Sequence, residues 1–295
     1  MKPAPFAYHR PATVADALSV LAEHGDEAKA LAGGQSLVPM LALRLARFEH
    51  LVDLNHIAGL GEVSLVNGQL VIGAMTRQAV LERDAEVAAA VPLLPRATRL
   101  IGHFQIRNRG TAGGSLAHAD PASEYPAVAV ALEATFDIAG PTGTRTVDAA
   151  TFFEGTWRTC LQADELLSAV RFPIASRRAG FAIEEMARRE GDFALAGVAA
   201  AVTLTEDGKV ARLGMGLFGV GPTPVRAVSA ETAAAGQPAS GLLANAEALD
   251  ELGHLATDPL EPPDDIHATG WYRRRVAAHL ATRALRAALE EATNG

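Results

Sequence analysis

Residues 101–127 read IGHFQIRNRGTAGGSLAHADPASEYPA, and this stretch decides how the chain is expected to fold. It holds a glycine-serine turn, TAGGS, at residues 111–115. No Asp or Glu occurs from residue 87 to residue 119, although the whole chain has a net charge of −8. Basic and imidazole side chains gather in the same region: Arg96, Arg99, Arg107, Arg109, His103 and His118. Such a concentration of positive charge beside a glycine-rich turn favours an anionic ligand such as a pyrophosphate.

A second interpretation of the same residues stays open, in which an Arg-rich face meets an acidic neighbour such as another subunit. The two interpretations can both hold. In secondary structure, segment 101–119 is expected to form a loop. Asp120-Pro121 then starts a helix, with Asp120 as N-cap and Pro121 at the first helical position, and the helix continues through Leu132.

A second glycine turn, Gly33-Gly34-Gln35-Ser36, follows the short apolar strand AKALA at residues 28–32. Ser36 can cap the helix that begins behind it, with Pro39 tolerated in the first turn. Glycines let backbone N–H groups approach an anion, and a helix N-terminus adds partial positive charge. The alternative is a tight turn whose serine only caps a helix. No lysine follows either turn, so neither is a phosphate loop of the G-x-x-x-x-G-K-[ST] type.

A third glycine pattern is expected to be misleading. Residues 214–219, GMGLFG, match the dinucleotide fingerprint G-x-G-x-x-G and follow a strand. Pro222 and Pro224 stand where the required helix should begin. The pattern therefore predicts a glycine-rich strand end.

The composition argues against several classes of function. A net charge of −8 and 5% aromatic residues do not favour binding of nucleic acid or of a membrane surface. We find no run of 18 apolar residues and no signal-peptide core near the N-terminus, so no transmembrane segment and a cytoplasmic location are expected. The single cysteine, Cys160, cannot ligate an iron–sulfur cluster or a structural zinc by itself. No catalytic constellation and no metal site are predicted.

Hairpins and helices alternate along the chain, which predicts an α+β fold with at least two domains and a boundary near residues 176–178. Turn dipeptides Asn67-Gly68 and Asp207-Gly208 predict two hairpins. A third hairpin is expected over 135–147 and a strand over 165–173. The remaining helices are expected at about 14–21, 77–91, 95–103, 241–256 and 268–293.

Three segments together resemble the flavoprotein, or medium, subunit of molybdenum-containing hydroxylases: AGGQS at 32–36, the stretch at 101–127 and MARREGDFALAGVA at 186–199. This family includes aerobic carbon monoxide dehydrogenase, xanthine dehydrogenase and bacterial N-heterocycle hydroxylases, and the resemblance covers roughly residues 1–290. It implies an FAD domain of the vanillyl-alcohol-oxidase (PCMH) type over 1–177, with lobes of about 1–55 and 56–177. A smaller α+β domain like the carbon monoxide dehydrogenase flavoprotein C-terminal domain would follow over 178–290.

The resemblance also implies a set of residues that contact FAD. One side of the pyrophosphate would lie against Ala32, Gly33, Gly34, Gln35 and Ser36. The other side would lie against Thr111, Gly114 and Ser115, with further flavin contacts from Ile101, Ala117, Glu124 and Leu167. Phe193 stands where some members carry a tyrosine near the flavin ring, Gln35 where histidine is frequent, and Glu185 where many have lysine. These departures weaken an assignment to carbon monoxide as substrate.

The function that the resemblance implies is electron transfer without substrate chemistry in this chain. A large subunit would oxidise the substrate at a molybdenum cofactor, and a small subunit would pass electrons through two [2Fe–2S] clusters to the FAD. The FAD would reduce an external acceptor, within a dimer of heterotrimers. Two alternatives are kept: a non-enzymatic anion-binding or scaffold subunit, and a self-contained flavin oxidase of the same superfamily.

Overall fold

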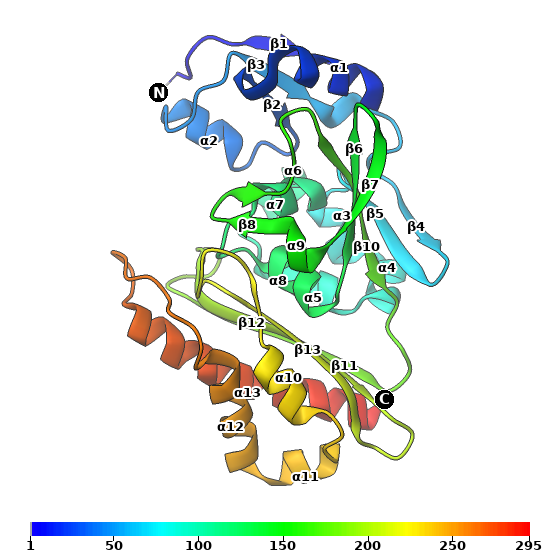
Figure 1. The fold of residues 1–295 in the computed structure, drawn as a ribbon, viewed down its shortest axis with the longest axis vertical. Helices are drawn as coiled ribbons and strands as arrows, with labels where there is room; N and C mark the ends of the chain where they lie inside the picture. Colours follow the sequence, from blue (N-terminus) through cyan, green and yellow to red (C-terminus); the bar gives the residue numbers. More distant parts are fainter. Residues whose placement is uncertain (1) are drawn as a thin grey trace.

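The computed structural model describes residues 2–295, and Met1, the first residue of the expected FAD domain, lies outside the described part. Three sheets follow one another along the longest axis of the molecule (Figure 1). The N-terminal sheet lies at one end, the C-terminal sheet at the other, and the sheet formed by the middle of the chain lies between them. Each sheet has its own hydrophobic core, and the α+β character is as predicted.

The N-terminal lobe is a three-stranded parallel sheet in the order β1-β3-β2. Its elements are β1 (Ala7–His9), α1 (Val14–His24), β2 (Ala28–Leu31), α2 (Leu37–Ala42) and β3 (His50–Asp53), with short 3₁₀ helices at Gly25–Glu27 and Leu54–His56. Thr13 caps α1 through a capping box with Asp16. Ser36 precedes α2, but its side chain makes no capping hydrogen bond, so that expected role is wrong.

The middle lobe is an antiparallel sheet in the order β4-β5-β10-β6-β7, backed by helices. Asn67 and Gly68 have φ values of +50° and +77°, as a hairpin of two left-handed residues requires. The strands are β4 (Val63–Val66), β5 (Gln69–Gly73), β6 (Thr135–Gly140), β7 (Gly143–Asp148) and β10 (Leu166–Pro173), with a small hairpin of β8 (Phe153–Gly155) and β9 (Arg158–Thr159). The helices are α3 (Gln78–Arg83), α4 (Ala85–Ala90), α5 (Leu93–Leu100), α6 (Phe104–Arg109), α7 (Ala112–His118), α8 (Glu124–Ala131) and α9 (Ala149–Phe152).

The predicted loop at 101–119 is wrong, because α6 and α7 occupy most of it. A glycine inside a helix costs about 1 kcal/mol relative to alanine, so Gly113-Gly114 favoured a loop from sequence alone. Tertiary packing reverses that preference, since a Cβ at Gly113 would overlap Ala74 of the chain beyond β5.

Two predicted helix boundaries also differ. Asp120 accepts a hydrogen bond from the Ala122 amide, and the helix begins only at Glu124, so Asp120 is not its N-cap. The helix expected over 77–91 is interrupted at Asp84, whose side chain caps α4.

The C-terminal part is an antiparallel sheet, β11-β12-β13-β14, covered on one face by helices (Figure 1). Its elements are β11 (Ala179–Ala187), β12 (Ala194–Leu204), β13 (Val210–Phe218), β14 (Val225–Arg226), α10 (Val228–Ala234), α11 (Ala239–Ala244), α12 (Ala246–Thr257) and α13 (Gly270–Asn294). Asn245 caps α12 and so interrupts the helix predicted over 241–256. None of the helices between residues 2 and 295 is long and apolar enough to cross a membrane.

The third glycine pattern lies in strand β13, as predicted, and it serves packing. A Cβ at Gly214 or Gly216 would overlap the carbonyl oxygen of Ala131 or Ala127, respectively. Both carbonyls belong to α8 of the middle lobe, so the glycines let that helix lie directly on the C-terminal sheet. Arg96 of α5 joins the same two parts through a bidentate ion pair with Glu291 of α13, at 2.6 and 2.7 Å.

Candidate functional site

The two glycine-serine turns, about 80 residues apart in sequence, touch one another. A Cβ on Gly114 would lie 2.6 Å from the Thr111 hydroxyl and 3.3 Å from the Cβ of Ala32. A Cβ on Gly33 would overlap the carbonyl oxygen of Arg109, just before the second turn. Only a residue without a side chain permits this close approach of backbone to backbone. The structure therefore brings the N-terminal and middle lobes together at the two turns.

A polar network that the sequence did not reveal fixes this contact. The Asn55 side-chain amide donates to the carbonyl of Ala32 at 2.9 Å. Arg77 donates to the Asn55 side-chain oxygen at 2.6 Å, and also to the carbonyl of Arg109. Asn55 and Arg77 thus bind the backbone carbonyls of Ala32 and Arg109, which precede the first and the second turn.

Asp53 anchors the network from the end of β3. Its carboxylate accepts from the Asn55 backbone amide at 2.9 Å and from the hydroxyl of Tyr8. Burial opposes ionisation of Asp53, but the bonds from Tyr8 and Asn55 outweigh it and lower its pKa. The sequence did contain a signal for this network. Asp53 ends β3 and Asn55 comes just after it, at the same edge of the parallel sheet as the turn that follows β2.

The two turns offer different hydrogen-bonding groups. Within residues 2–295, the backbone N–H groups of Gly33 through Ser36 donate to no protein acceptor, and Gly34 is left-handed with φ +74°. The first amides of α7 are engaged: Gly113 donates to Ala74 at 2.8 Å and Gly114 to the Thr111 hydroxyl at 3.1 Å. The first turn can therefore present backbone donors to an anion, and the second mainly the hydroxyl of Ser115.

The positive charge of the 87–119 segment is divided between structure and site. Arg96 and Arg107 form ion pairs inside the chain, with Glu291 and Glu82. Arg109 has no ion pair within the described residues and lies beside Arg77. Burial, followed by repulsion from Arg109, lowers the pKa of Arg77. Asp53 partly offsets the charge of Arg77, and the remaining positive charge of Arg77 and Arg109 beside the glycine turns favours a negative ligand there.

The other expected site residues belong to the middle lobe, except Phe193, which belongs to the C-terminal part. Ser115 lies 3.2 Å from Ser123, oxygen to oxygen, just ahead of the buried Glu124. Ile101 and Ala117 pack against the middle core, and Leu167 is buried within it. Phe193 is 70% exposed at the start of β12. Its neighbour Gly191 packs against the His103 ring, which places this loop near the N-terminus of α6.

Two carboxyl groups, the buried Glu124 and the half-buried Glu185, lie where the middle lobe meets the C-terminal sheet. Burial, and then the charge of Glu185, raises the pKa of Glu124 to about 8. Burial raises the pKa of Glu185 itself to about 7. One Glu185 oxygen and one Asp192 oxygen are buried without a hydrogen-bond partner in the described part of the chain. This corner can hold protons near neutral pH.

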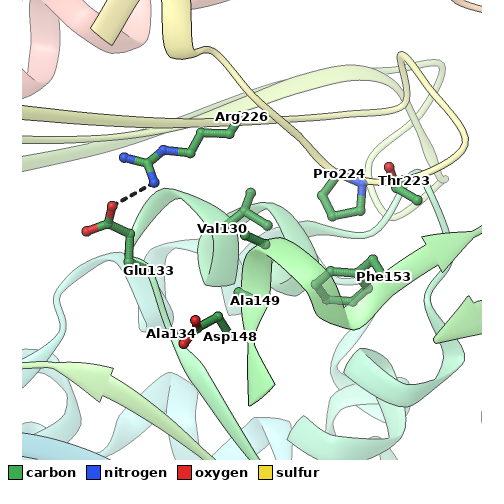
Figure 2. A pocket seen from close by; sticks show the side chains of 10 residues that line it. Val130, Glu133, Ala134, Asp148, Ala149, Phe153, Thr223, Pro224 and Arg226 are labelled. Atoms are coloured by element: carbon green, nitrogen blue, oxygen red, sulfur yellow. Dashed lines mark ion pairs between the residues drawn. The ribbon is translucent and has the colours of Figure 1, made fainter. Parts of the chain in front are cut away.

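A separate hollow of about 390 Å³ lies between the end of α8, α9 and the loop before β14 (Figure 2). Glu133 and Arg226 face one another across it in an ion pair of 2.6 Å. None of the thirteen expected FAD contacts lines this hollow. It is therefore a different place from the junction of the glycine turns.

Comparisons with known proteins agree with the resemblance seen in the sequence. Residues 4–175 match the family described as the FAD binding domain in molybdopterin dehydrogenase, and residues 181–288 match the CO dehydrogenase flavoprotein C-terminal domain. The chain is 38% identical to the carbon monoxide dehydrogenase medium chain of Hydrogenophaga pseudoflava, with 98% of each chain covered. It is also 38% identical to the caffeine dehydrogenase subunit beta of a Pseudomonas strain, covering 97% of this chain and 95% of that one.

A solved structure gives the same picture at the level of the fold. One chain of carbon monoxide dehydrogenase from Hydrogenophaga pseudoflava, in a form that lacks the Mo-pyranopterin moiety of the molybdenum cofactor, superposes with a TM-score of 0.94 at 39% identity, covering 99% of both chains. The expected FAD domain followed by a C-terminal flavoprotein domain is thereby confirmed. The chain belongs to the family of FAD-binding medium subunits of the molybdopterin dehydrogenases.

Proposed function

We propose that this chain holds FAD at the junction of its two glycine turns and serves as the electron outlet of a molybdenum hydroxylase. Electrons would arrive from two [2Fe–2S] clusters on a small partner subunit, after a large subunit has oxidised the substrate at its molybdenum cofactor. FAD, when bound, can accept electrons singly from the clusters and release two to an external acceptor. The observation that carries the proposal is the contact between the turns beside four amides without protein acceptors.

The residues of the junction fit a dinucleotide pyrophosphate. Backbone donors of Gly33, Gly34, Gln35 and Ser36 would take one side, next to Ala32. The hydroxyls of Thr111 and Ser115, with Gly114 between them, would take the other side, as the family resemblance implies. Charges on Arg77 and Arg109 would lower the cost of gathering two phosphates there.

The remaining expected contacts would shape the flavin end of the site. Ile101, Ala117 and Leu167 supply apolar surface, and Glu124 a buried carboxyl group. The exposed ring of Phe193 would cover or face the cofactor without the hydroxyl that a tyrosine would bring. Single substitutions of these residues test the assignments, and the amount of flavin bound per chain is the measurement.

The substrate is proposed to be set by the large subunit. This chain is 38% identical both to a carbon monoxide dehydrogenase chain and to a caffeine dehydrogenase chain. Equal similarity to subunits of enzymes with such different names is what a shared electron-transfer module would give. The final acceptor is likewise a property to be tested with the whole complex.

The assembly and location are further parts of the proposal. We propose a dimer of heterotrimers, and analytical ultracentrifugation of the complex would measure its mass. We propose a cytoplasmic location, with which the free thiol of Cys160 is compatible. We also propose domains of 1–177, divided near residue 55, and 178–290, with a link around Arg178, whose φ is +58°; limited proteolysis at that link would support this division.

Two experiments test the function. The first releases the cofactor by denaturation and identifies it by chromatography; one FAD per chain is expected, and FMN would contradict the two-turn interpretation. A colourless protein that still assembles with partners would favour a scaffold subunit.

The second experiment is anaerobic stopped-flow of the lone chain and of the reconstituted complex. Dithionite should bleach both, whereas organic substrate should bleach only the complex. Rapid bleaching of the lone chain by substrate would favour a self-contained flavin oxidase.

A further inference from the structure

Three histidines from three elements of the N-terminal lobe meet on one side of its sheet. His9 is the last residue of β1, His24 the last of α1 and His50 the first of β3. The Nε2 atom of His9 lies 2.9 Å from the Nδ1 atom of His50. The rings of His24 and His50 stack with centroids 3.5 Å apart. All three are half-buried.

We propose that His9, His24 and His50 form a binding site for one divalent first-row transition-metal ion of the Zn²⁺ class. One ring nitrogen from each residue lies within 4.8 Å of the other two. A tetrahedral Zn²⁺ with Zn–N bonds of about 2.0–2.1 Å needs nitrogens about 3.3 Å apart, so the rings must turn from their stacked and hydrogen-bonded arrangement to complete the set. Water would fill the fourth position.

The donor set decides the class of ion. Three imidazoles suit Zn²⁺, Cu²⁺ or Ni²⁺, whereas Mg²⁺ and Ca²⁺ require several oxygen ligands. Within residues 2–295, no carboxylate forms an ion pair with any of the three histidines. Glu23 is near enough for its charge to act on His9, but it forms no ion pair with the cluster.

The surroundings keep the cluster ready to bind. The stacked rings must rotate about their Cβ bonds to point at a common ion, and half-exposure leaves room for that. Their backbones are fixed, because β1 and β3 are paired strands and α1 packs on the same sheet.

The consequence of binding would be structural. An ion held by all three residues would join the C-terminus of α1 to the paired strands β1 and β3. Anything that binds only the folded state raises its stability. The three histidines are far apart in sequence and show no ligand spacing along the chain, so the sequence predicts no metal site. The proposal does not depend on FAD binding.

The test uses the purified full chain, stripped with EDTA and dialysed, titrated with ZnCl₂ by calorimetry. We expect one Zn²⁺ per chain, and affinity at least about tenfold weaker in His24→Gln and in His50→Gln. His279→Gln, the same change at an exposed position of α13, is the matched control and should bind like the wild type. Added Zn²⁺ should raise the thermal unfolding midpoint of the wild type and the control only.

Thermal unfolding in EDTA separates loss of a ligand from damage to the fold. If His24→Gln and His279→Gln melt together in EDTA and differ only with Zn²⁺, the site is supported. The proposal is overturned if the wild type takes up less than one ion per chain, or if both cluster variants bind Zn²⁺ as tightly as His279→Gln. If one cluster variant has a lower unfolding midpoint than the wild type in EDTA, its fold is damaged, and the Zn²⁺ affinity of the other cluster variant then decides the outcome.

Discussion

Replacing Gly33 by alanine tests whether the contact between the two turns is needed for FAD. The backbone of Gly33 lies outside the left-handed region, so alanine adopts it without strain. The added Cβ would overlap the carbonyl oxygen of Arg109 and lie 2.8 Å from the Cα of Gly110. Both neighbours are backbone atoms and cannot rotate away. The turns must therefore separate to accept the methyl group.

The expected size of the effect follows from the cost of overpacking, about 1–3 kcal/mol. Without ligand, the chain can relieve the overlap by opening the junction. If FAD needs both turns, it binds only those molecules in which the junction is closed. The apparent Kd for FAD is then the intrinsic Kd divided by the fraction of molecules with a closed junction. A cost of 1–3 kcal/mol corresponds to a rise of about fivefold to about 150-fold.

The assay is titration of the flavin-free chain with FAD, followed by quenching of flavin fluorescence. Gly155→Ala is the matched control, because no atom lies within 4 Å of a Cβ at Gly155 and its φ is not positive. The control should bind like the wild type. The reasoning is refuted if Gly33→Ala binds FAD within about twofold of Gly155→Ala. Far-UV circular dichroism of both variants checks that the fold is kept.

Three further perturbations follow from the same geometry. Asn55→Ala removes the donor to Ala32 and the acceptor of Arg77, and should cost about 1–3 kcal/mol in urea unfolding together with part of the flavin content. Arg96→Ala and Glu291→Ala, singly and together, should give a coupling energy of no more than about 1 kcal/mol by thermal unfolding, because both side chains are more than a third exposed. Burial and Glu185 raise the pKa of Glu124 from 4.5 to about 8, so the folded flavin-free chain holds an extra proton between those values. The free energy of unfolding should fall as pH rises through that window, with Glu124 contributing at most about 1.4 kcal/mol per pH unit. Glu124→Gln should make this slope shallower, leaving the part due to Glu185, whereas the exposed Glu190→Gln keeps the full slope.

Local turn chemistry explains which parts of the fold were predictable. Asn67-Gly68 and Asp207-Gly208 each lie between two apolar strands, and both form the expected hairpins. The turn itself selects the register, so neighbouring residues suffice for the prediction. Helix α7 was missed because Gly113-Gly114 disfavours a helix locally. Contact with Ala74, nearly 40 residues earlier, is what makes those glycines necessary.

The candidate site was predictable to the same limited extent. Both glycine turns are visible in the sequence, and the structure brings them into contact. The bonds that fix them involve Asp53, Asn55 and Arg77, which belong to two different lobes. No spacing along the chain connects such residues. The meeting of His9, His24 and His50 escaped for the same reason, since pairing of parallel strands sets it.

Two glycine-rich segments of this chain are expected from the sequence to follow a strand, as a nucleotide-binding turn does, and the structure separates them by whether their backbone amides have acceptors. In residues 214–219 the glycines up to Gly216 pair with β12 in a regular ladder, and their missing side chains make room for α8. The backbone N–H groups of these glycines belong to the sheet, so the G-x-G-x-x-G pattern serves the packing of α8 on β13. At Gly33 the missing side chain also makes room for neighbouring backbone, but the amides from Gly33 to Ser36 find no acceptor in the described chain. A run of backbone donors left unpaired beside Arg77 and Arg109 is costly unless water or an anion accepts from it. The same residue type thus packs a helix in one place and keeps a ligand site open in the other.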